Sequence, residues 1–200
     1  MNNKVASTSE PIHELLARRW SPRAFDLDKP VSKEALTSLF EAARWAPSCF
    51  NDQPWRYLVW DRFGDKAAWE RAFGCLVEGN QAWVQHAAVL IAAIAGSEFA
   101  RNGKPNRWGQ YDSGAASENM CLQATALGLS IHQMGGFDAE QLRAEFQIPE
   151  SFTPVAMIAL GHPGDPNSLK ESYREMELGP RERRPLGENF YSDGWENPFS

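Results

Sequence analysis

The stretch Ala87-Ala88-Val89-Leu90-Ile91-Ala92-Ala93-Ile94-Ala95 decides the fold, because it is the longest apolar run in the chain. Nine apolar residues in succession, with Val, Leu and Ile at the centre, are typical of a strand covered on both faces. The run is much shorter than the roughly 20 residues that a membrane-spanning helix needs. The sequence therefore predicts a central, fully buried strand over 87–95.

Hydrophobic spacing on either side of this run predicts further strands and several helices. The expected strands cover 57–60, 129–134 and 154–161, and the expected helices cover 11–18, 32–46, 66–73, 79–85, 111–127 and 138–146. Because strands and helices interleave, the class is α/β or α+β, with helices on a small sheet.

No internal repeat or linker divides the sequence, so we expect a single domain over residues 10–200, preceded by a flexible N-terminus over 1–9. The polar segment 97–109 is long enough to form a lid loop. The segment 166–200 contains Phe190, Tyr191, Trp195 and Phe199. A free tail would not need these aromatic side chains, and we expect it to dock on a folded body.

Composition limits the possible functions. The chain has 200 residues, with 20 Lys and Arg against 26 Asp and Glu, and the resulting net charge of −6 disfavours nucleic acid as a partner. Three cysteines without a CxxC motif exclude a zinc ribbon and a disulfide scaffold. The sequence shows neither a signal peptide nor a membrane span, so we expect a cytoplasmic protein. The chain has eight Trp and is 12% aromatic, and we expect most of these side chains to fill the core and interfaces. The same enrichment also fits a planar ligand or a large subunit interface.

Several kinds of active site find no support. The four histidines, His13, His86, His132 and His162, lack metal-ligand spacing, so we expect no metal. No local signature supports Cys49 as a nucleophile. Neither GxGxxG nor GxxxxGK[ST] occurs, which disfavours a dinucleotide-binding Rossmann site and a P-loop.

Three polar clusters remain as candidates for ligand binding. They are Arg19, Ser21 and Arg23; Ser48, Asn51 and Gln53; and Arg181, Arg183 and Arg184. Guanidinium groups bind phosphate through paired donors, and carboxamides match a heterocycle that carries both donors and acceptors. Taken one by one, the clusters also fit a solvated helix end, turn chemistry and ordinary surface charge.

Six segments, in order and spacing, resemble the nitroreductase-like FMN-dependent oxidoreductases. They are RRWSPRAF (18–25), APSCFNDQPW (46–55), GNQAW (79–83), ALGL with GGFD (126–129 and 135–138), VAMIALGHP (155–163) and RRPL (183–186). Together the matches span about residues 12–195. This resemblance implies an α+β, nitroreductase-like fold, in which helices flank a small mixed sheet and two chains form an intertwined homodimer. It also implies that the 166–200 tail docks on the partner subunit.

The resemblance further implies that FMN binds at the subunit interface. The implied cofactor-binding residues are Arg19, Trp20, Ser21, Arg23, Pro47, Ser48, Cys49, Asn51, Gln53, Asn80, Met134, Gly135, Gly136, Arg181, Arg183 and Arg184. Of these, Ser48, Cys49 and Asn51 would reach the flavin from the other subunit. Arg183, with Arg181 or Arg184, would hold the phosphate. Trp108 and Phe137 are candidates for the substrate-facing side.

The function that the resemblance implies is reduction of nitroaromatic, quinone or similar flat acceptors, with NAD(P)H as donor and ping-pong hydride transfer. No catalytic acid or base is assigned, because the flavin carries the chemistry. Alternatives are dehalogenation, dehydrogenation or flavin cleavage on the same fold, and a non-enzymatic flavin-binding or redox-sensing protein. Three residues depart from the family pattern: Trp83 where members carry Lys, Gly135 for an acidic residue, and Cys49 for Ser. Arg23 or Arg19 would then supply the positive charge near flavin N1.

Overall fold

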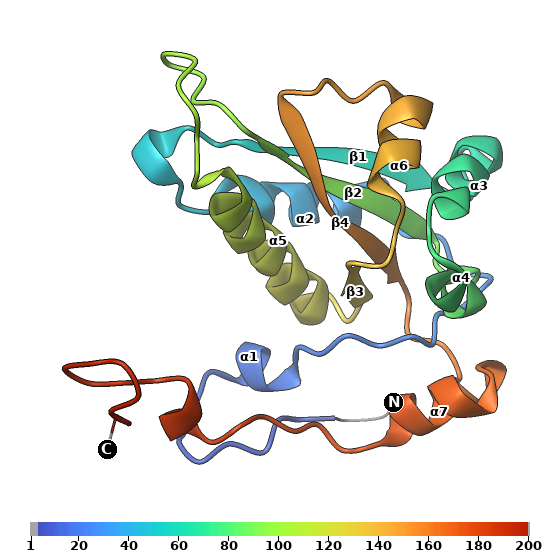
Figure 1. The fold of residues 1–200 in the computed structure, drawn as a ribbon. Coiled ribbons are helices and arrows are strands. Elements are labelled where there is room, and N and C mark those ends of the chain that lie inside the picture. Colours follow the sequence, from blue (N-terminus) through green and yellow to red (C-terminus); the bar gives the residue numbers. More distant parts are fainter. Residues whose placement is uncertain (1–3, 200) are drawn as a thin grey trace.

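A computed structural model describes residues 4–199, which form a four-stranded sheet with helices on both faces (Figure 1). The strand order is β1 (Trp55–Asp61), β2 (Val89–Gly96), β4 (Phe152–Gly161) and β3 (Ser130–Met134). All three pairings are antiparallel. The predicted α+β class with a small flanked sheet is confirmed, but the described strands form an antiparallel sheet where a mixed one was expected. The reason is that the connections after β1 and β3 return the chain to the end of the sheet that it left.

The predicted central strand is confirmed as β2, which is buried along its whole length. Its alternate side chains enter two different cores, as strand geometry requires. Leu90, Ala92 and Ile94 pack against α3 (Lys66–Gly74), α4 (Glu78–Val84) and α6 (Ala139–Phe146). Val89, Ile91 and Ala93 pack against α2 (Lys33–Arg44) and α5 (Gly109–Ala126).

Polar side chains start the helices close to the expected positions. Ser32, Asp65 and Asp138 each accept a hydrogen bond from a backbone N–H in the first turn of α2, α3 and α6. The first helix is shorter than expected: α1 covers Glu14–Arg18. His13 is the reason, because its backbone is extended and its Nδ1 accepts a hydrogen bond from Leu15 N at 3.2 Å.

Helix α5 connects the lid segment to β3 and packs against the sheet with its small residues. Ala116, Met120 and Ala124 of its inner face are buried. Its first residue, Gly109, lies so close to β2 that a Cβ there would be 2.2 Å from Gly96 O. Only glycine fits at this contact, which fixes where the helix leaves the sheet.

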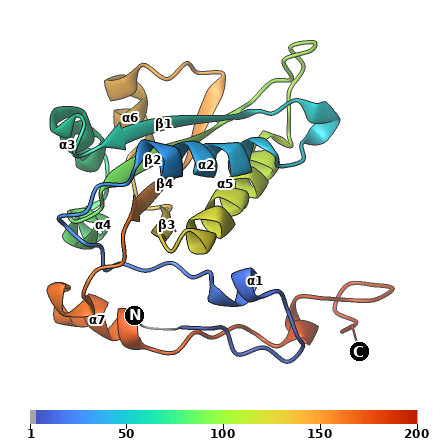
Figure 2. The ribbon, with the colours of Figure 1, turned by 180° about the vertical axis from the view of Figure 1, so that it is seen from behind.

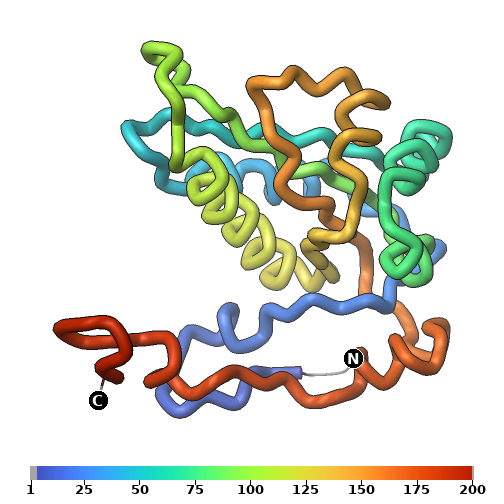
Figure 3. The backbone as a smooth tube through the Cα atoms, in the orientation of Figure 1, coloured from blue at the N-terminus to red at the C-terminus, as the bar shows by residue number. Residues whose placement is uncertain are grey.

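The two ends of the chain form a layer beside the body. In Figures 2 and 3 the N-terminal segment and the C-terminal segment run next to one another below α5 and β3. This layer contains a helix that the sequence did not indicate, α7 (Glu171–Leu178), and the short turns η2 (Pro166–Ser168) and η3 (Leu186–Glu188). Over the described residues no helix combines the length and the apolar surface that a membrane crossing requires.

Part of the segment 1–9, for which a flexible N-terminus was expected, makes hydrogen bonds to the rest of the chain. Lys4 Nζ donates to Glu177 O at 2.8 Å, and Ala6 N donates to Ala17 O at 2.8 Å. Residues 4–6 are therefore held against the C-terminal segment and α1. Residues 1–3 of this prediction lie outside the described residues.

Candidate functional site

Residues 19–25, which we call the arginine segment, follow α1 in an extended conformation beside β3 and carry the first polar cluster. Arg19 Nε pairs with Glu118 Oε1 of α5 at 3.3 Å, and Arg19 Nη1 lies 3.5 Å from Ser21 Oγ. The Arg23 guanidinium lies 5.7 Å from the centre of the Trp83 ring. Since successive residues of an extended chain point in opposite directions, Arg19, Ser21 and Arg23 share one side of the segment.

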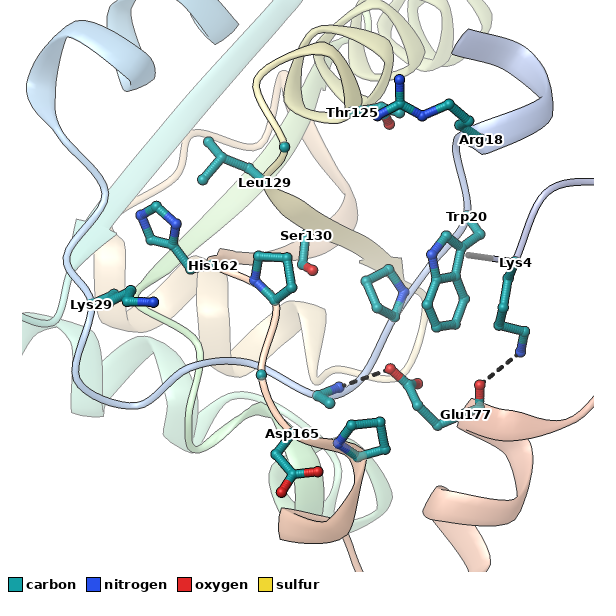
Figure 4. Close-up of a pocket in the computed structure, with 16 residues that line it drawn as sticks. Lys4, Arg18, Trp20, Lys29, Thr125, Leu129, Ser130, His162, Asp165 and Glu177 are labelled. Carbon is teal, nitrogen blue, oxygen red and sulfur yellow. Dashed lines mark hydrogen bonds between the residues drawn. The ribbon is translucent and has the colours of Figure 1, made fainter. Parts of the chain in front are cut away.

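Trp20 belongs to the other side of this segment. With Pro22 and Ala24 it lines a cavity of about 820 Å³ that continues along Ser130, Pro163 and Glu177 (Figure 4). Lys4 Nζ lies 4.5 Å from the centre of the Trp20 ring. The structure therefore places Trp20 away from the arginine side of its own segment.

The tail arginines take different positions. Arg181 donates from Nη1 to Lys4 O at 2.6 Å and Ala17 O at 2.8 Å, and from Nη2 to Arg19 O at 2.8 Å. It thereby ties the tail to the N-terminal segment at Lys4 and to the C-terminal end of α1. Arg183 and Arg184 are exposed, and Arg183 Nη1 donates only to the neighbouring Glu182 O among the contacts of the described residues.

Positive charges lie close together around this segment. Burial lowers the pKa of Arg181, and the charges of Arg19 and Arg183 lower it further. Burial also lowers the pKa of Lys4, Glu177 raises it, and Arg181 and Arg23 lower it. The charges of these cations therefore act on one another, and two carboxylates, Glu118 and Glu177, lie among them.

Asn80 and the turn after β3 form the next part of the site. Asn80 Nδ2 donates to Gly136 O at 2.8 Å, and Val77 N donates to the same oxygen at 3.2 Å. A Cβ at Gly136 would lie 2.7 Å from Asn80 Nδ2, whereas one at Gly135 would meet nothing within 4 Å. The turn is thus closed towards α4 at Gly136 and open at Gly135, and Met134 before it is buried.

His132 lies between this turn and the arginine segment, and the sequence alone gave it no role in the site. Its ring centre is 4.5 Å from that of Trp83, and Nδ1 lies 2.9 Å from Pro22 O. Burial is the main reason that its pKa falls to about 4. The ring is therefore neutral at pH 7, and because a carbonyl oxygen only accepts, the proton is on Nδ1.

The loop 46–55 contains the second polar cluster in a strained conformation. Phe50, Asn51 and Gln53 have φ angles of 55°, 56° and 50°, in the left-handed region that non-glycine residues rarely adopt. Strain of this kind is concentrated at functional sites. Ser48 Oγ accepts from Gln53 N at 3.0 Å, and the buried Asp112 of α5 accepts from Cys49 N at 3.0 Å. The turn η1 (Cys49–Asn51) is held by these bonds, and the preceding Pro47 is exposed.

The expected lid segment 97–109 packs on this loop. Asp52 accepts from Ala100 N at 3.0 Å and from Asn106 Nδ2 at 3.3 Å. The Arg101 guanidinium lies 3.8 Å from the centre of the Phe50 ring. Trp108, at the end of this segment, is 40% exposed. Phe137 pairs with Leu76 beside Asn80 instead, so the two candidate substrate residues belong to different parts of the molecule.

Within residues 4–199, no hydrogen bond or ion pair joins the 46–55 loop to the arginine segment. Both touch α5, through Asp112 and Glu118 respectively. Six residues along a helix separate these contacts by about 9 Å and rotate them by about 120° around the axis. One chain therefore presents the two clusters on different faces of α5. Sequence analysis missed three carboxylates that bind these segments: Asp112, Glu118 and Glu177. No local motif indicates them, because each lies far along the chain from the segment that it binds.

A sequence model described as the Nitroreductase family matches residues 16–162, well over half of the chain. The protein belongs to this family. The match includes the arginine segment, the 46–55 loop, Asn80 and the turn at Gly136, whereas α7 and the tail arginines lie beyond it.

Relatives of this nitroreductase-family chain agree with its fold. One crystal structure, described as an oxidoreductase containing FMN, is 34% identical and superposes with a TM-score of 0.89 over 98% of both chains. A Desulfovibrio desulfuricans protein in complex with FMN is 28% identical, with a TM-score of 0.71 over 94% of this chain and 99% of that one. A Thermus thermophilus protein named NADH dehydrogenase is 31% identical over 180 residues, covering 74% of this chain and 84% of its own.

Proposed function

We propose that this nitroreductase-family chain is an FMN-dependent NAD(P)H oxidoreductase that reduces nitroaromatic, quinone or similar flat acceptors. The observation that carries the proposal is that Arg19 and Arg23 share one side of this segment, together with Asn80 and the turn that is open at Gly135. Such a surface offers guanidinium groups to a phosphate and a gap without side chains to a flat ring. Two structural relatives that contain FMN support the same cofactor.

The residues present fit FMN. The phosphate and the ribityl chain would be held by Arg19, Ser21, Arg183 and Arg184. Arg19 and Ser21 lie on the side of their segment opposite the Trp20 cavity, and Arg183 and Arg184 are exposed. Arg181 would act through the backbone oxygens that it binds, because both of its terminal nitrogens are already engaged. The backbone at 134–136 would line the ring. From a second copy, the site would receive Pro47, Ser48, Cys49, Asn51 and Gln53.

When bound, FMN supplies the group that accepts hydride from NAD(P)H and passes it to the acceptor. Arg23, placed over Trp83, would offer positive charge to the polar edge of the ring and favour added negative charge there. Asn80 would donate to or accept from the same edge once it exchanges its bond to Gly136 O. His132 cannot supply a proton near pH 7, because it is neutral and its N–H bonds Pro22 O.

A homodimer is part of this proposal, because the loop 46–55 and the arginine segment occupy different faces of α5. Gly114 on the outer face of α5 is exposed, and a Cβ there would meet nothing within 4 Å. A second copy can approach such a surface closely. The tail also presents Leu186, Phe190, Trp195 and Phe199, each more than half exposed, as a docking surface for that copy.

The direct test is reconstitution of the purified chain with FMN, followed by anaerobic addition of NADPH or NADH. We expect a yellow protein that bleaches and regains its colour when a quinone or nitroaromatic compound is added. Yellow protein that never bleaches would favour a flavin-binding role or another chemistry on the same fold. A chain that takes up no FMN would contradict the proposal.

Replacing Arg183 or Arg184 by Ala tests the phosphate contacts. A charge-assisted hydrogen bond contributes about 1.5–3 kcal/mol, so each variant should raise the Kd for FMN roughly ten- to a hundredfold. Arg174→Ala on α7 removes the same charge from a guanidinium that pairs with Glu171, and serves as the control. Equal affinities in all three variants, measured by fluorescence titration, would mean that the tail arginines are surface charge.

A further inference from the structure

Glu177 is a buried carboxylate on α7, a helix that lies outside the family-matched residues 16–162. It is 2% exposed. Its Oε2 accepts from Arg23 N at 2.8 Å, and its Oε1 accepts from Ala24 N at 3.2 Å. A buried ion requires such partners, because leaving it without hydrogen bonds costs several kcal/mol.

The two N–H groups belong to the segment that carries the first arginine cluster. With both peptide groups bound, the backbone of Arg23 has a fixed direction, and the Arg23 side chain leaves it towards Trp83. Arg181 binds Arg19 O four residues earlier, so the C-terminal segment holds this stretch at two points. Lys4 strengthens the arrangement, since its Nζ binds the backbone oxygens of Met176 and Glu177.

We propose that Glu177 is a positioning residue for the cofactor site: its carboxylate fixes the Arg23 and Ala24 peptide groups and so aims the Arg23 guanidinium at the flavin. The proposal rests on the proposed function, because it concerns FMN bound at that site. It assigns to α7 a part in cofactor binding that the family-matched segment does not contain.

Two possible roles of Glu177 predict opposite changes in FMN affinity when its charge is removed. If the carboxylate acted only as a negative charge among the cations, its removal would strengthen binding of a phosphate. If it positions Arg23, its removal weakens binding, because an amide oxygen accepts from one N–H while the NH₂ group faces the other. The direction of the change in FMN affinity therefore distinguishes the two roles.

The experiment compares the full-length protein with Glu177→Gln and Glu175→Gln. Glu175 is an exposed residue of the same helix, so this control removes the same charge without touching the arginine segment. FMN affinity is measured in about 0.5 M salt, where the Debye length is about 4 Å and exposed charges are screened. The visible spectrum and the reduction potential of the bound flavin are recorded as well, since a purely structural role would leave both unchanged.

We expect Glu177→Gln to raise the Kd for FMN on the order of tenfold and to shift the spectrum and potential of the bound flavin. Glu175→Gln should match the unaltered protein. Equal or tighter binding by Glu177→Gln, with an unchanged spectrum, would overturn the positioning role while the proposed function stands. An unaltered protein that binds no FMN would remove both proposals.

A second variant guards against a failure to fold. Glu177→Asp keeps the charge and withdraws the carboxylate by one methylene, so it should weaken FMN binding and shift the spectrum less than Glu177→Gln does. If neither variant folds, as judged by circular dichroism, Glu177 is required for the fold itself and the positioning role is overturned.

Discussion

At the scale of single residues, His132 shows how packing changes chemistry. The imidazole lies against Trp83 and bonds Pro22 O, and burial lowers its pKa from 6.5 to about 4. Arg23 and Arg19 lower it further, since a second positive charge there would be repelled. A histidine on a strand, without metal-ligand spacing, gives no sign of this in the sequence.

His132 should make the folded protein lose stability as the pH falls. Between pH 6.5 and about 4 the unfolded chain binds a proton at this residue and the folded chain does not, so protonation favours unfolding. The shift corresponds to about 3 kcal/mol over the whole window. Urea unfolding at pH 7 and pH 5 should show a smaller loss for His132→Gln than for the unaltered protein. An equal loss in both would mean that carboxylates alone cause the pH dependence.

At the scale of elements, the turn between β3 and α6 shows why two adjacent glycines are not equivalent. A methyl group at Gly136 would lie 2.7 Å from Asn80 Nδ2 and 2.8 Å from Val77 Cγ2, whereas one at Gly135 would face open space. Asn80 in turn binds Gly136 O. The turn and the start of α4 therefore form one unit, and a side chain at Gly136 would force them apart.

Gly136→Ala should destabilise the protein by about 1–2 kcal/mol, because the methyl group displaces the Asn80 amide from its bond. Gly135→Ala is the matched control, and its free energy of unfolding should stay within about 1 kcal/mol of the original. Chemical denaturation measures both. Equal effects of the two substitutions would show that the contact between the turn and α4 does not restrain Gly136.

At the scale of the whole molecule, the C-terminal arm of residues 186–199 exposes several large apolar side chains to solvent. Phe190 is 57% exposed, Trp195 is 84% exposed, and the arm's backbone bonds are internal, such as Phe199 N to Phe190 O at 2.8 Å. Figure 1 shows this arm extending past α1 and away from the sheet. Apolar patches of this kind mark interaction surfaces.

If the proposed dimer forms through this arm, the double variant Phe190→Ser and Trp195→Ser should shift it towards monomer and weaken FMN binding with it. The physical reason is that the arm loses the apolar area that the second copy would cover, at about 25 cal/mol per Å². Light scattering after gel filtration measures the mass. Phe63→Ser, an exposed aromatic substitution outside the arm, is the control. A dimer unaffected by the double variant would place the interface elsewhere.

Much of the fold could be predicted from local patterns. The buried strand at 87–95 and the starts of α2, α3 and α6 follow from apolar runs and N-capping side chains, which act over a few residues. The antiparallel order and helix α7 could not be predicted this way. Strand direction depends on where each connection returns, and α7 is stabilised by Glu177 binding a segment more than 150 positions away.

For the candidate site, the sequence by itself determined the chemical types: guanidinium groups in two segments, carboxamides in a third, and glycines in a turn that resembles a flavin family. Only the tertiary structure decided what each group contacts. It engages Arg181 with three carbonyl oxygens, turns Trp20 towards a cavity, and separates the 46–55 loop from the arginines on α5. The reason is that a residue's chemistry is local, whereas its direction and partners depend on packing between distant parts of the chain.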